Sequence, residues 1–138
     1  LRRRLDDRLG AALVGIGVFE PGSTLLAGGK TLTDREFEDL KSHGVVGDIA
    51  LQFFDDEGRH VDHPINRRIV GTGMEQIKAI GRRIGVAGGA EKVRAILAAL
   101  RGGLINVLVT DSYTAVRLLE EHHAPTDTAA DQASHVRG

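Results

Sequence analysis

Apolar residues form one unbroken run near the start of the chain. The segment "AALVGIGVF", Ala11 to Phe19, carries no charged side chain and lies between Gly10 and Pro21. A short apolar run between turn residues is typical of a strand that is buried on both faces, as in a parallel sheet. We therefore expect a buried strand here.

Two later segments have the pattern of helices. "TDREFEDLKSHG" opens with a capping box, in which Thr33 accepts from first-turn amides while Glu36 reaches back, and it closes at Gly44. "MEQIKAIGRR" places its apolar residues at helical spacing, beginning with Met74. Each segment predicts a short helix.

The middle of the chain has the pattern of strands. "GDIALQFFDDEGRHVDHPI" alternates toward Phe53 and Phe54 and then reaches the polar "DDEG", whose Gly58 tolerates a positive φ. This pattern predicts a β-hairpin or strand pair that turns at "DDEG". The segment "RRIVG", which begins at Arg67, is expected to add a short strand.

The last third of the chain alternates between strand and helix patterns. The strand "IGVA" precedes the helix "AEKVRAILAALRGG", and the strand "INVLVT" precedes the helix "SYTAVRLLEEHH". Alternation at this spacing predicts a parallel sheet with right-handed crossovers. The expected fold class is α/β, with a Rossmann-like, mostly parallel sheet and flanking helices.

Length and composition indicate one folded unit. The chain has 138 residues, of which 41% are hydrophobic, so one domain can bury a core. The final segment "APTDTAADQASHVRG", residues 124–138, has no apolar period, and we expect a disordered tail after a domain at 1–123. Because the chain begins at Leu1 without a methionine, we also expect it to be a fragment of a longer protein.

Charge and residue usage exclude several functional classes. The net charge is -1 and the pI is about 6.7, so the chain has no bulk attraction to nucleic acid. It has no cysteine, which excludes disulfides and thiolate ligands and fits a reducing compartment. No apolar run approaches the roughly 20 residues of a membrane helix, and no secretory signal is evident. We expect a cytoplasmic protein that is not embedded in a membrane.

One candidate binding site follows the strand "IGVA". Gly88 and Gly89 allow backbone to approach a ligand closely, and their amides precede a helix start, where anions bind. Lys92 lies in the first helical turn, where its charge opposes the helix dipole. A phosphate or carboxylate would explain that position. A solvated surface lysine beside a tight turn explains it equally well.

Two aspartates are further candidates. Asp111 ends a strand and could accept from sugar hydroxyls, although capping the helix that begins at Ser112 is the favoured role. Asp48 follows Gly47 at the start of an apolar run. Its carboxylate either faces water in a turn or binds ligand hydroxyls.

The remaining polar residues suggest little chemistry. Arg67 and Arg68 are either a phosphate clamp or, the favoured interpretation, a charged edge strand. The histidines, including the pair His60 and His63, show no reliable metal spacing. No Ser/His/Asp set accompanies a nucleophile elbow. We expect no metal, no other cofactor and no catalytic residue.

The chain resembles the sugar-binding domain of SorC-type bacterial transcriptional regulators. The segments that carry the resemblance are "ALVGIGVF", "GDIALQFFDDEGR" and "VAGGAEKVRAILAALRGGLINVLVTDSYTAVRLL". They lie in the family's order between Ala11 and Glu121, and the block that begins with "VAGGAEK" is the most specific.

The resemblance implies a fold and a function. Members of this family are similar in fold to sugar-phosphate isomerases and glucosamine-6-phosphate deaminases, yet they act as sensors of phosphorylated sugars. An N-terminal helix-turn-helix domain, which this chain lacks, binds operator DNA, and the proteins form homo-oligomers, dimers or tetramers. The lysine of the family's "AGGxxK" block is a phosphate-site residue and corresponds to Lys92. The acidic residue that contacts sugar corresponds to Asp48.

The chain also departs from the family. The family's effector domain is longer, and its first half carries a "GGTT"-like phosphate loop that this chain does not contain. The resemblance therefore implies that residues 1–123 are the C-terminal part of an effector domain, with only half of its ligand contacts. An enzyme of the isomerase or deaminase type, with Asp48 or Asp111 as base, is the alternative. A purely structural oligomerisation module is a third.

Overall fold

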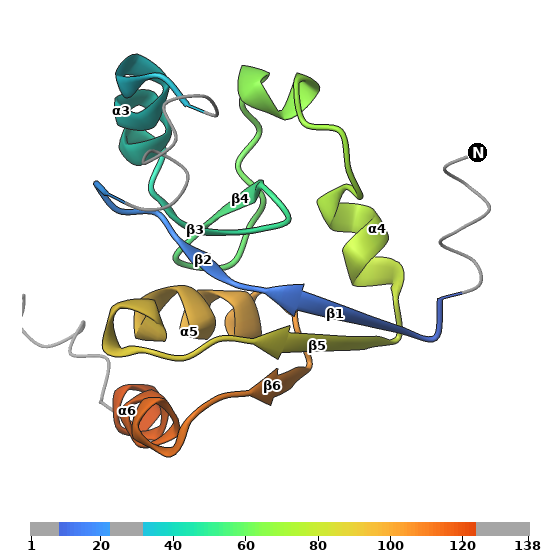
Figure 1. Ribbon diagram of the computed structural model, residues 1–138, viewed down its shortest axis with the longest axis vertical. Coiled ribbons are helices and arrows are strands. Elements are labelled where there is room, and N and C mark those ends of the chain that lie inside the picture. Colours follow the sequence, from blue (N-terminus) through green and yellow to red (C-terminus); the bar gives the residue numbers. More distant parts are fainter. Residues whose placement is uncertain (1–8, 23–31, 124–138) are drawn as a thin grey trace, which may run out of the picture.

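The strands pair into two sheets, one parallel and one antiparallel (Figure 1). The computed structural model describes residues 9–22 and 32–123. One sheet has three parallel strands in the order β1-β5-β6, namely β1 (Ala11–Gly15), β5 (Arg82–Val86) and β6 (Val107–Val109). The other has three antiparallel strands in the order β2-β3-β4, namely β2 (Gly17–Val18), β3 (Val45–Ile49) and β4 (Gln52–Asp55). Ile16, between β1 and β2, joins the sheets.

The parallel sheet follows the alternation of strands and helices in the sequence. After β5 the chain forms the 3-10 turn η2 (Ala90–Lys92), the helix α5 (Val93–Arg101), then β6 and the helix α6 (Ser112–His123). One face of this sheet, with Val14 and Leu108, packs against the core. The residues of α5 that are buried in that core are Val93, Ala95, Ile96, Leu97, Ala98 and Ala99. The predicted parallel sheet and both helices are thus confirmed.

The opposite face of the parallel sheet is uncovered in the described part of the chain. Leu13 is 72% exposed, Val86 45% and Val109 53%, and the strand register places all three on this face. The prediction of one strand buried on both faces from Ala11 to Phe19 is therefore wrong. The run divides at Ile16 into β1 and β2, which belong to different sheets, and no described element packs on the outer side of β1.

The middle of the chain also contains a hairpin turn that was not predicted. β3 pairs with β4 through a two-residue turn at Ala50 and Leu51, ahead of the predicted turn at "DDEG". Both residues have positive φ, 52° and 62°, which such hairpin turns require and which usually calls for Asn or Gly. The backbone N–H of Leu51 donates to Asp48 Oδ2 at 3.0 Å and supports the turn.

The predicted hairpin turn at "DDEG" is confirmed as the next bend of the chain. Phe54 and His60 form an antiparallel bridge across it, and the N–H of Asp55 donates to the Arg59 carbonyl at 3.0 Å. The N–H of Gly58 donates to the carbonyl of Asp55, and Gly58 has the expected positive φ, 70°. This bend lies against the end of α5, because a Cβ on Gly58 would meet the Ala98 carbonyl oxygen at 2.2 Å and Gly102 Cα at 2.6 Å. The glycine is thus required by contact as well as by conformation.

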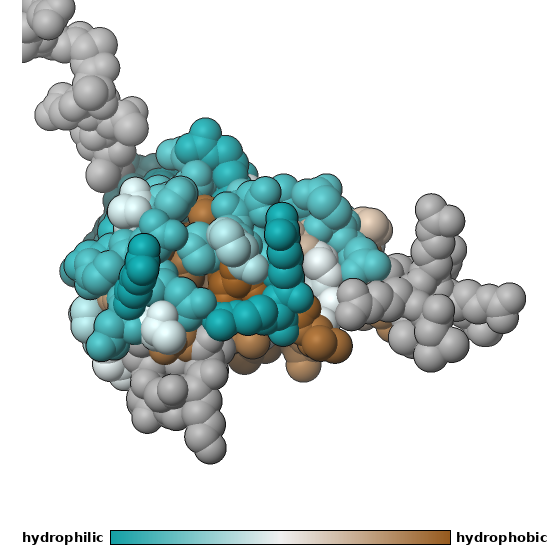
Figure 2. Space-filling view, turned by 90° about the horizontal axis from the view of Figure 1, so that it is seen from above, coloured by the Kyte–Doolittle hydropathy of each residue, from teal (hydrophilic) through white to brown (hydrophobic). Residues whose placement is uncertain are grey.

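Two hydrophobic cores lie on opposite sides of the β3–β4 hairpin. Phe54 belongs to the core beneath the parallel sheet and Phe53 to the second core. The second core is covered by α3 (Asp34–Ser42), whose Phe37 stacks on Phe19 with ring centroids 4.5 Å apart. The side of the molecule on which α3 lies is mostly hydrophilic at its surface (Figure 2).

The predicted ends of α3 are confirmed. The Oγ1 of Thr33 accepts from the N–H of Glu36, and Glu36 Oε2 accepts from the N–H of Thr33. Gly44, just after the helix, has a φ of 77°. The helix predicted from Met74 is also present as α4 (Met74–Ala79).

The short strand predicted at "RRIVG" is wrong. The chain instead forms the 3-10 helix η1 (Pro64–Arg67), since proline presets the first helical position and the His63 side chain accepts from the N–H of Ile65. Arg68 then pairs with Glu36 of α3 at 2.7 Å. The charged edge strand expected at Arg67 and Arg68 is therefore absent from this segment.

The tail predicted at residues 124–138 lies outside the described residues. Across the described ranges, no helix has the length and apolar character needed to cross a membrane.

The contact between the "DDEG" bend and α5 generates a stability prediction. Gly44→Ala places a side chain at positive φ in open space, so it should cost about 1–2 kcal/mol of unfolding free energy. Gly58→Ala adds overpacking against α5, typically a further 1–3 kcal/mol. Urea unfolding of both variants measures the difference. Equal losses would show that the bend does not press on α5.

Candidate ligand-binding site

The carboxyl ends of the parallel strands converge on one edge of the molecule. β1 leads there into Gly17, β5 into Gly88 and Gly89, and β6 into Thr110 and Asp111. η2 lies beside β2 at this edge. In open α/β sheets ligands bind outside the carboxyl ends of the strands, because loops and helix N-termini meet there.

Asp48 is the buried acid of this edge. The residue is 9% exposed, and its side chain lies across Gly17, its partner in the β2–β3 ladder. Oδ2 accepts from the N–H of Leu51, and Oδ1 accepts no hydrogen bond from the described residues. Burial raises the pKa of the Asp48 carboxyl, while the Leu51 N–H and the charge of Lys92 act to lower it.

Lys92 lies close enough to Asp48 for its charge to act on that carboxyl, although the two residues are distant in sequence. It is the last residue of η2, precedes the first residue of α5 and is half-buried. Its positive charge acts on the pKa of Asp48, yet no ion pair of 4.0 Å or less joins them in the described structure. A buried carboxylate and an ammonium group thus share one site without neutralising each other by direct contact.

The glycine turn after β5 is tied to the start of α6. The N–H of Gly89 donates to Thr114 Oγ1 at 2.9 Å, and the φ of Gly89 is 118°, which favours glycine. Gly88 packs on the neighbouring carboxylate, because a Cβ there would meet Asp111 Oδ2 at 2.3 Å. The expectation of two free successive amides needs correction at Gly89, whose amide already has a partner within the protein.

Asp111 caps α6, as the favoured interpretation holds. Its Oδ1 accepts from the N–H of Thr114, and its Oδ2 accepts from the Thr114 hydroxyl, both at 2.8 Å. The backbone bond from Thr114 is the main influence that lowers the pKa of Asp111. Contact between Asp111 and a ligand remains a prediction.

Sequence reasoning missed two residues of this edge. Thr114 is fully buried and links Gly89 to Asp111, and Gly17 provides the space for Asp48. The signals were weak. A threonine three residues after a helix cap and a glycine inside an apolar strand are each common for other reasons.

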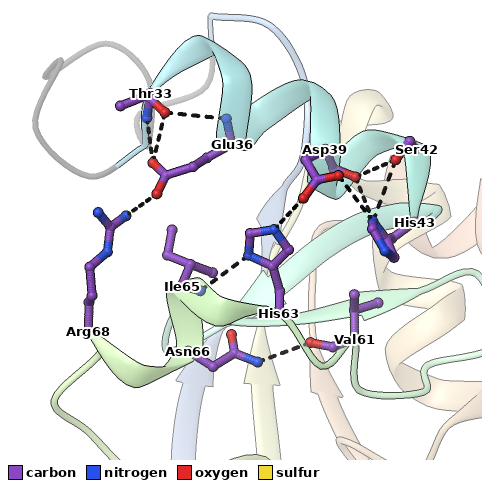
Figure 3. Close-up of polar contacts among 10 residues, drawn as sticks. All are labelled: Thr33, Glu36, Asp39, Ser42, His43, Val61, His63, Ile65, Asn66 and Arg68. Atoms are coloured by element: carbon purple, nitrogen blue, oxygen red, sulfur yellow. Dashed lines mark hydrogen bonds and ion pairs between the residues drawn. The ribbon is translucent and has the colours of Figure 1, made fainter.

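A histidine cluster joins α3 to η1 in another part of the molecule (Figure 3). His63 is 7% exposed, its Nε2 lies 2.8 Å from Asp39 Oδ2, and its Nδ1 accepts from the N–H of Ile65. The hydrogen bond with His63 is the main influence that lowers the pKa of Asp39. Because the backbone and Asp39 occupy both ring nitrogens, His63 serves to hold the two elements together.

The described residues contain no group of three or more His, Cys, Asp or Glu side chains that could hold a metal ion.

The fold is that of a domain of the α/β class. Comparison with known proteins identifies it further. Residues 4–120 match the family described as "Putative sugar-binding domain", and the chain belongs to this family, which occurs in SorC-type transcriptional regulators.

Two relatives of the chain are named as regulators. The chain is 48% identical over 77 residues to the transcriptional regulator LsrR of Escherichia coli O139:H28, covering 55% of this chain and 24% of that protein. It is 37% identical over 116 residues to the sorbitol operon regulator of Klebsiella pneumoniae, covering 83% and 36%. The chain therefore spans only about a quarter to about a third of these relatives.

Two solved structures show the same fold. The full-length sorbitol operon regulator SorC from Klebsiella pneumoniae superposes with a TM-score of 0.75 at 36% identity, over 85% of this chain and 37% of that one. A DeoR family transcriptional regulator from Listeria monocytogenes gives 0.76 at 32% identity, over 80% and 44%. The resemblance stated from the sequence is confirmed, and so is the α/β fold.

The Thr114 link generates a second prediction. Thr114→Val keeps the shape but leaves the Gly89 N–H and an Asp111 oxygen without their partner, so it should cost about 1–3 kcal/mol of unfolding free energy. Thr110→Val is the matched control, because Thr110 Oγ1 is buried without a hydrogen-bond partner among the described residues. Its removal should be neutral or stabilising. Equal losses in the two variants, measured by urea unfolding, would contradict the link.

Proposed function

We propose that this chain senses a phosphorylated sugar as the C-terminal part, residues 1–123, of the effector domain of a transcriptional regulator. Family membership supports a sugar ligand, and the relatives named above are regulators. The observation that carries the phosphorylated form is that Lys92 lies within electrostatic range of Asp48 at the carboxyl edge of the sheet.

The Asp48 carboxylate suits the sugar hydroxyls of such a ligand, and the Lys92 ammonium suits its phosphate. A carboxylate accepts hydrogen bonds from sugar hydroxyls, and an ammonium group donates to phosphate oxygens. Gly88 adds backbone that can approach the ligand closely at the same edge. A neutral sugar would leave Lys92 without an anionic ligand group, and inorganic phosphate would leave Asp48 without a sugar hydroxyl.

The whole protein is proposed to be a cytoplasmic homo-oligomer, a dimer or tetramer, that binds operator DNA through a domain outside this chain. The net charge of -1 supports placing the DNA contacts elsewhere. Sugar phosphate binding would shift the oligomer between states of different DNA affinity, a coupling typically worth about 1–3 kcal/mol.

An enzyme of the isomerase or deaminase type is the second candidate. The observation that favours it is the raised pKa of the buried Asp48, because a general base works best when its pKa lies near the working pH. Against it, the relatives named above are regulators. Incubation of the whole protein with sugar phosphates distinguishes the two, since turnover supports the enzyme and unchanged ligand supports the sensor.

The Lys92 contact is tested by calorimetry on the whole protein. The probes are ribose 5-phosphate, glucose 6-phosphate and fructose 6-phosphate, with inorganic phosphate beside them. Lys92→Ala should weaken the tightest sugar phosphate by about 1.5–3 kcal/mol, the range for hydrogen bonds to charged groups, or roughly 10- to 100-fold.

Lys78→Ala is the matched control. Lys78 is half-buried like Lys92, but it lies in α4, which precedes β5 and so stands at the amino end of the parallel strands. Lys78→Ala should bind the sugar phosphate with wild-type affinity. Unchanged affinity in Lys92→Ala, or equal losses in both variants, would refute the role of Lys92.

A further inference from the structure

Gly17 lies directly opposite Asp48 in the ladder between β2 and β3. A Cβ on Gly17 would meet Asp48 Oδ1 at 2.1 Å and Asp48 Cγ at 3.1 Å. The carboxylate therefore occupies the space that any other residue at position 17 would fill with its side chain. The two residues are complementary in shape.

A second contact holds the same carboxylate from its other side. The N–H of Leu51 binds Oδ2 at 3.0 Å, and it reaches Asp48 because the hairpin turns sharply at Ala50 and Leu51. Both turn residues adopt the left-handed conformation, at φ 52° and 62°, although neither is glycine. Such strained backbone persists where the surrounding structure imposes it, and it is concentrated at functional sites.

These two contacts leave the two oxygens of Asp48 in different states. Oδ2 already accepts a backbone hydrogen bond, whereas Oδ1 lies over Gly17 with no donor among the described residues. The charge of Lys92 acts on the same carboxyl. A ligand that reaches this edge therefore finds one acceptor oxygen with a defined direction.

We propose that Gly17 is a positioning residue, whose missing side chain orients the Asp48 carboxylate so that Oδ1 accepts from a single ligand hydroxyl. The ligand part of this inference rests on the proposed sugar-phosphate function, whereas the positioning part stands on the contacts within the protein. A buried acceptor aimed at one hydroxyl selects strongly against a ligand that lacks it.

The positioning is tested first by a double-mutant cycle on stability, without any ligand. Gly17→Ala should lower the urea midpoint in the wild-type background, because its Cβ displaces the carboxylate. In the Asp48→Ala background the same change should have no effect, since the displaced atoms are gone. In the Asp48→Asn background the loss should persist, because asparagine has the same shape.

Gly15→Ala is the matched control, since a Cβ on Gly15 has nothing within 4 Å in the described structure. It should leave the midpoint unchanged. An equal loss from Gly17→Ala in the wild-type and Asp48→Ala backgrounds would overturn the proposal, because Gly17 would then act through something other than Asp48.

The same variants of the whole protein test the ligand part by calorimetry. For the tightest of the three sugar phosphates, Gly17→Ala should weaken binding at least 10-fold and should add no loss to Asp48→Ala. Inorganic phosphate has no sugar hydroxyl, so it should bind Gly17→Ala as it binds the wild type.

The stability and calorimetry results distinguish the positioning of Asp48 by Gly17 from the contact of Asp48 with a ligand. Undiminished sugar-phosphate affinity in Gly17→Ala would overturn the positioning of Oδ1 toward the ligand. If the stability cycle is coupled but no sugar phosphate binds even the wild-type protein, the proposed function fails while the internal positioning of Asp48 by Gly17 is supported.

Discussion

Close packing of α5 against the β3–β4 hairpin and the "DDEG" bend that follows it positions the candidate site. The approach is possible at two glycines, because a Cβ on Gly47 would lie 3.0 Å from Ala95 Cβ and a Cβ on Gly58 would lie 2.2 Å from the Ala98 carbonyl oxygen. Since α5 begins directly after η2, this packing brings Lys92 to the strand that carries Asp48. Larger side chains at the glycines would separate the helix from the hairpin and the ammonium from the carboxylate.

Several features of this arrangement lower the stability of the fold. A carboxylate that is removed from water with one hydrogen bond is unfavourable, as the raised pKa of Asp48 reflects. The turn at Ala50 and Leu51 adds strain, and the bare outer face of β1, β5 and β6 exposes apolar side chains. The first two costs lie at the candidate site, as expected if ligand binding rather than stability selects these residues. The exposed outer face of β1, β5 and β6 is a surface on which further protein can pack, since both faces of parallel sheets are usually covered.

Sequence reasoning succeeded where local chemistry decides the structure. The capping box of Thr33 and Glu36 and the alternation of strands and helices after β5 need only neighbouring residues, and both were predicted correctly. It failed where distant contacts decide. The turn at Ala50 and Leu51 lacks turn residues and depends on Asp48, and the run from Ala11 to Phe19 divides because its two halves pair with different sheets.

The candidate site shows the same limit. Asp48, Gly88, Gly89, Lys92 and Asp111 were each identified from position and resemblance, and the structure gathers them at one edge. Nothing in the local sequence indicates that Thr114 occupies the Gly89 amide or that Gly17 lies beneath Asp48. These are contacts between segments that meet only in the folded chain, so no local pattern encodes them.

Burial of Asp48 within reach of the Lys92 charge is the basis of the proposed site. An NMR titration of the aspartate carboxyl resonances measures it directly, in the wild type and in Lys92→Ala. The pKa of Asp48 should lie above that of Asp111 in the same chain and should rise further when Lys92 is removed. An Asp48 pKa in the ordinary range that does not respond to Lys92→Ala would show that Asp48 is neither desolvated nor coupled to Lys92.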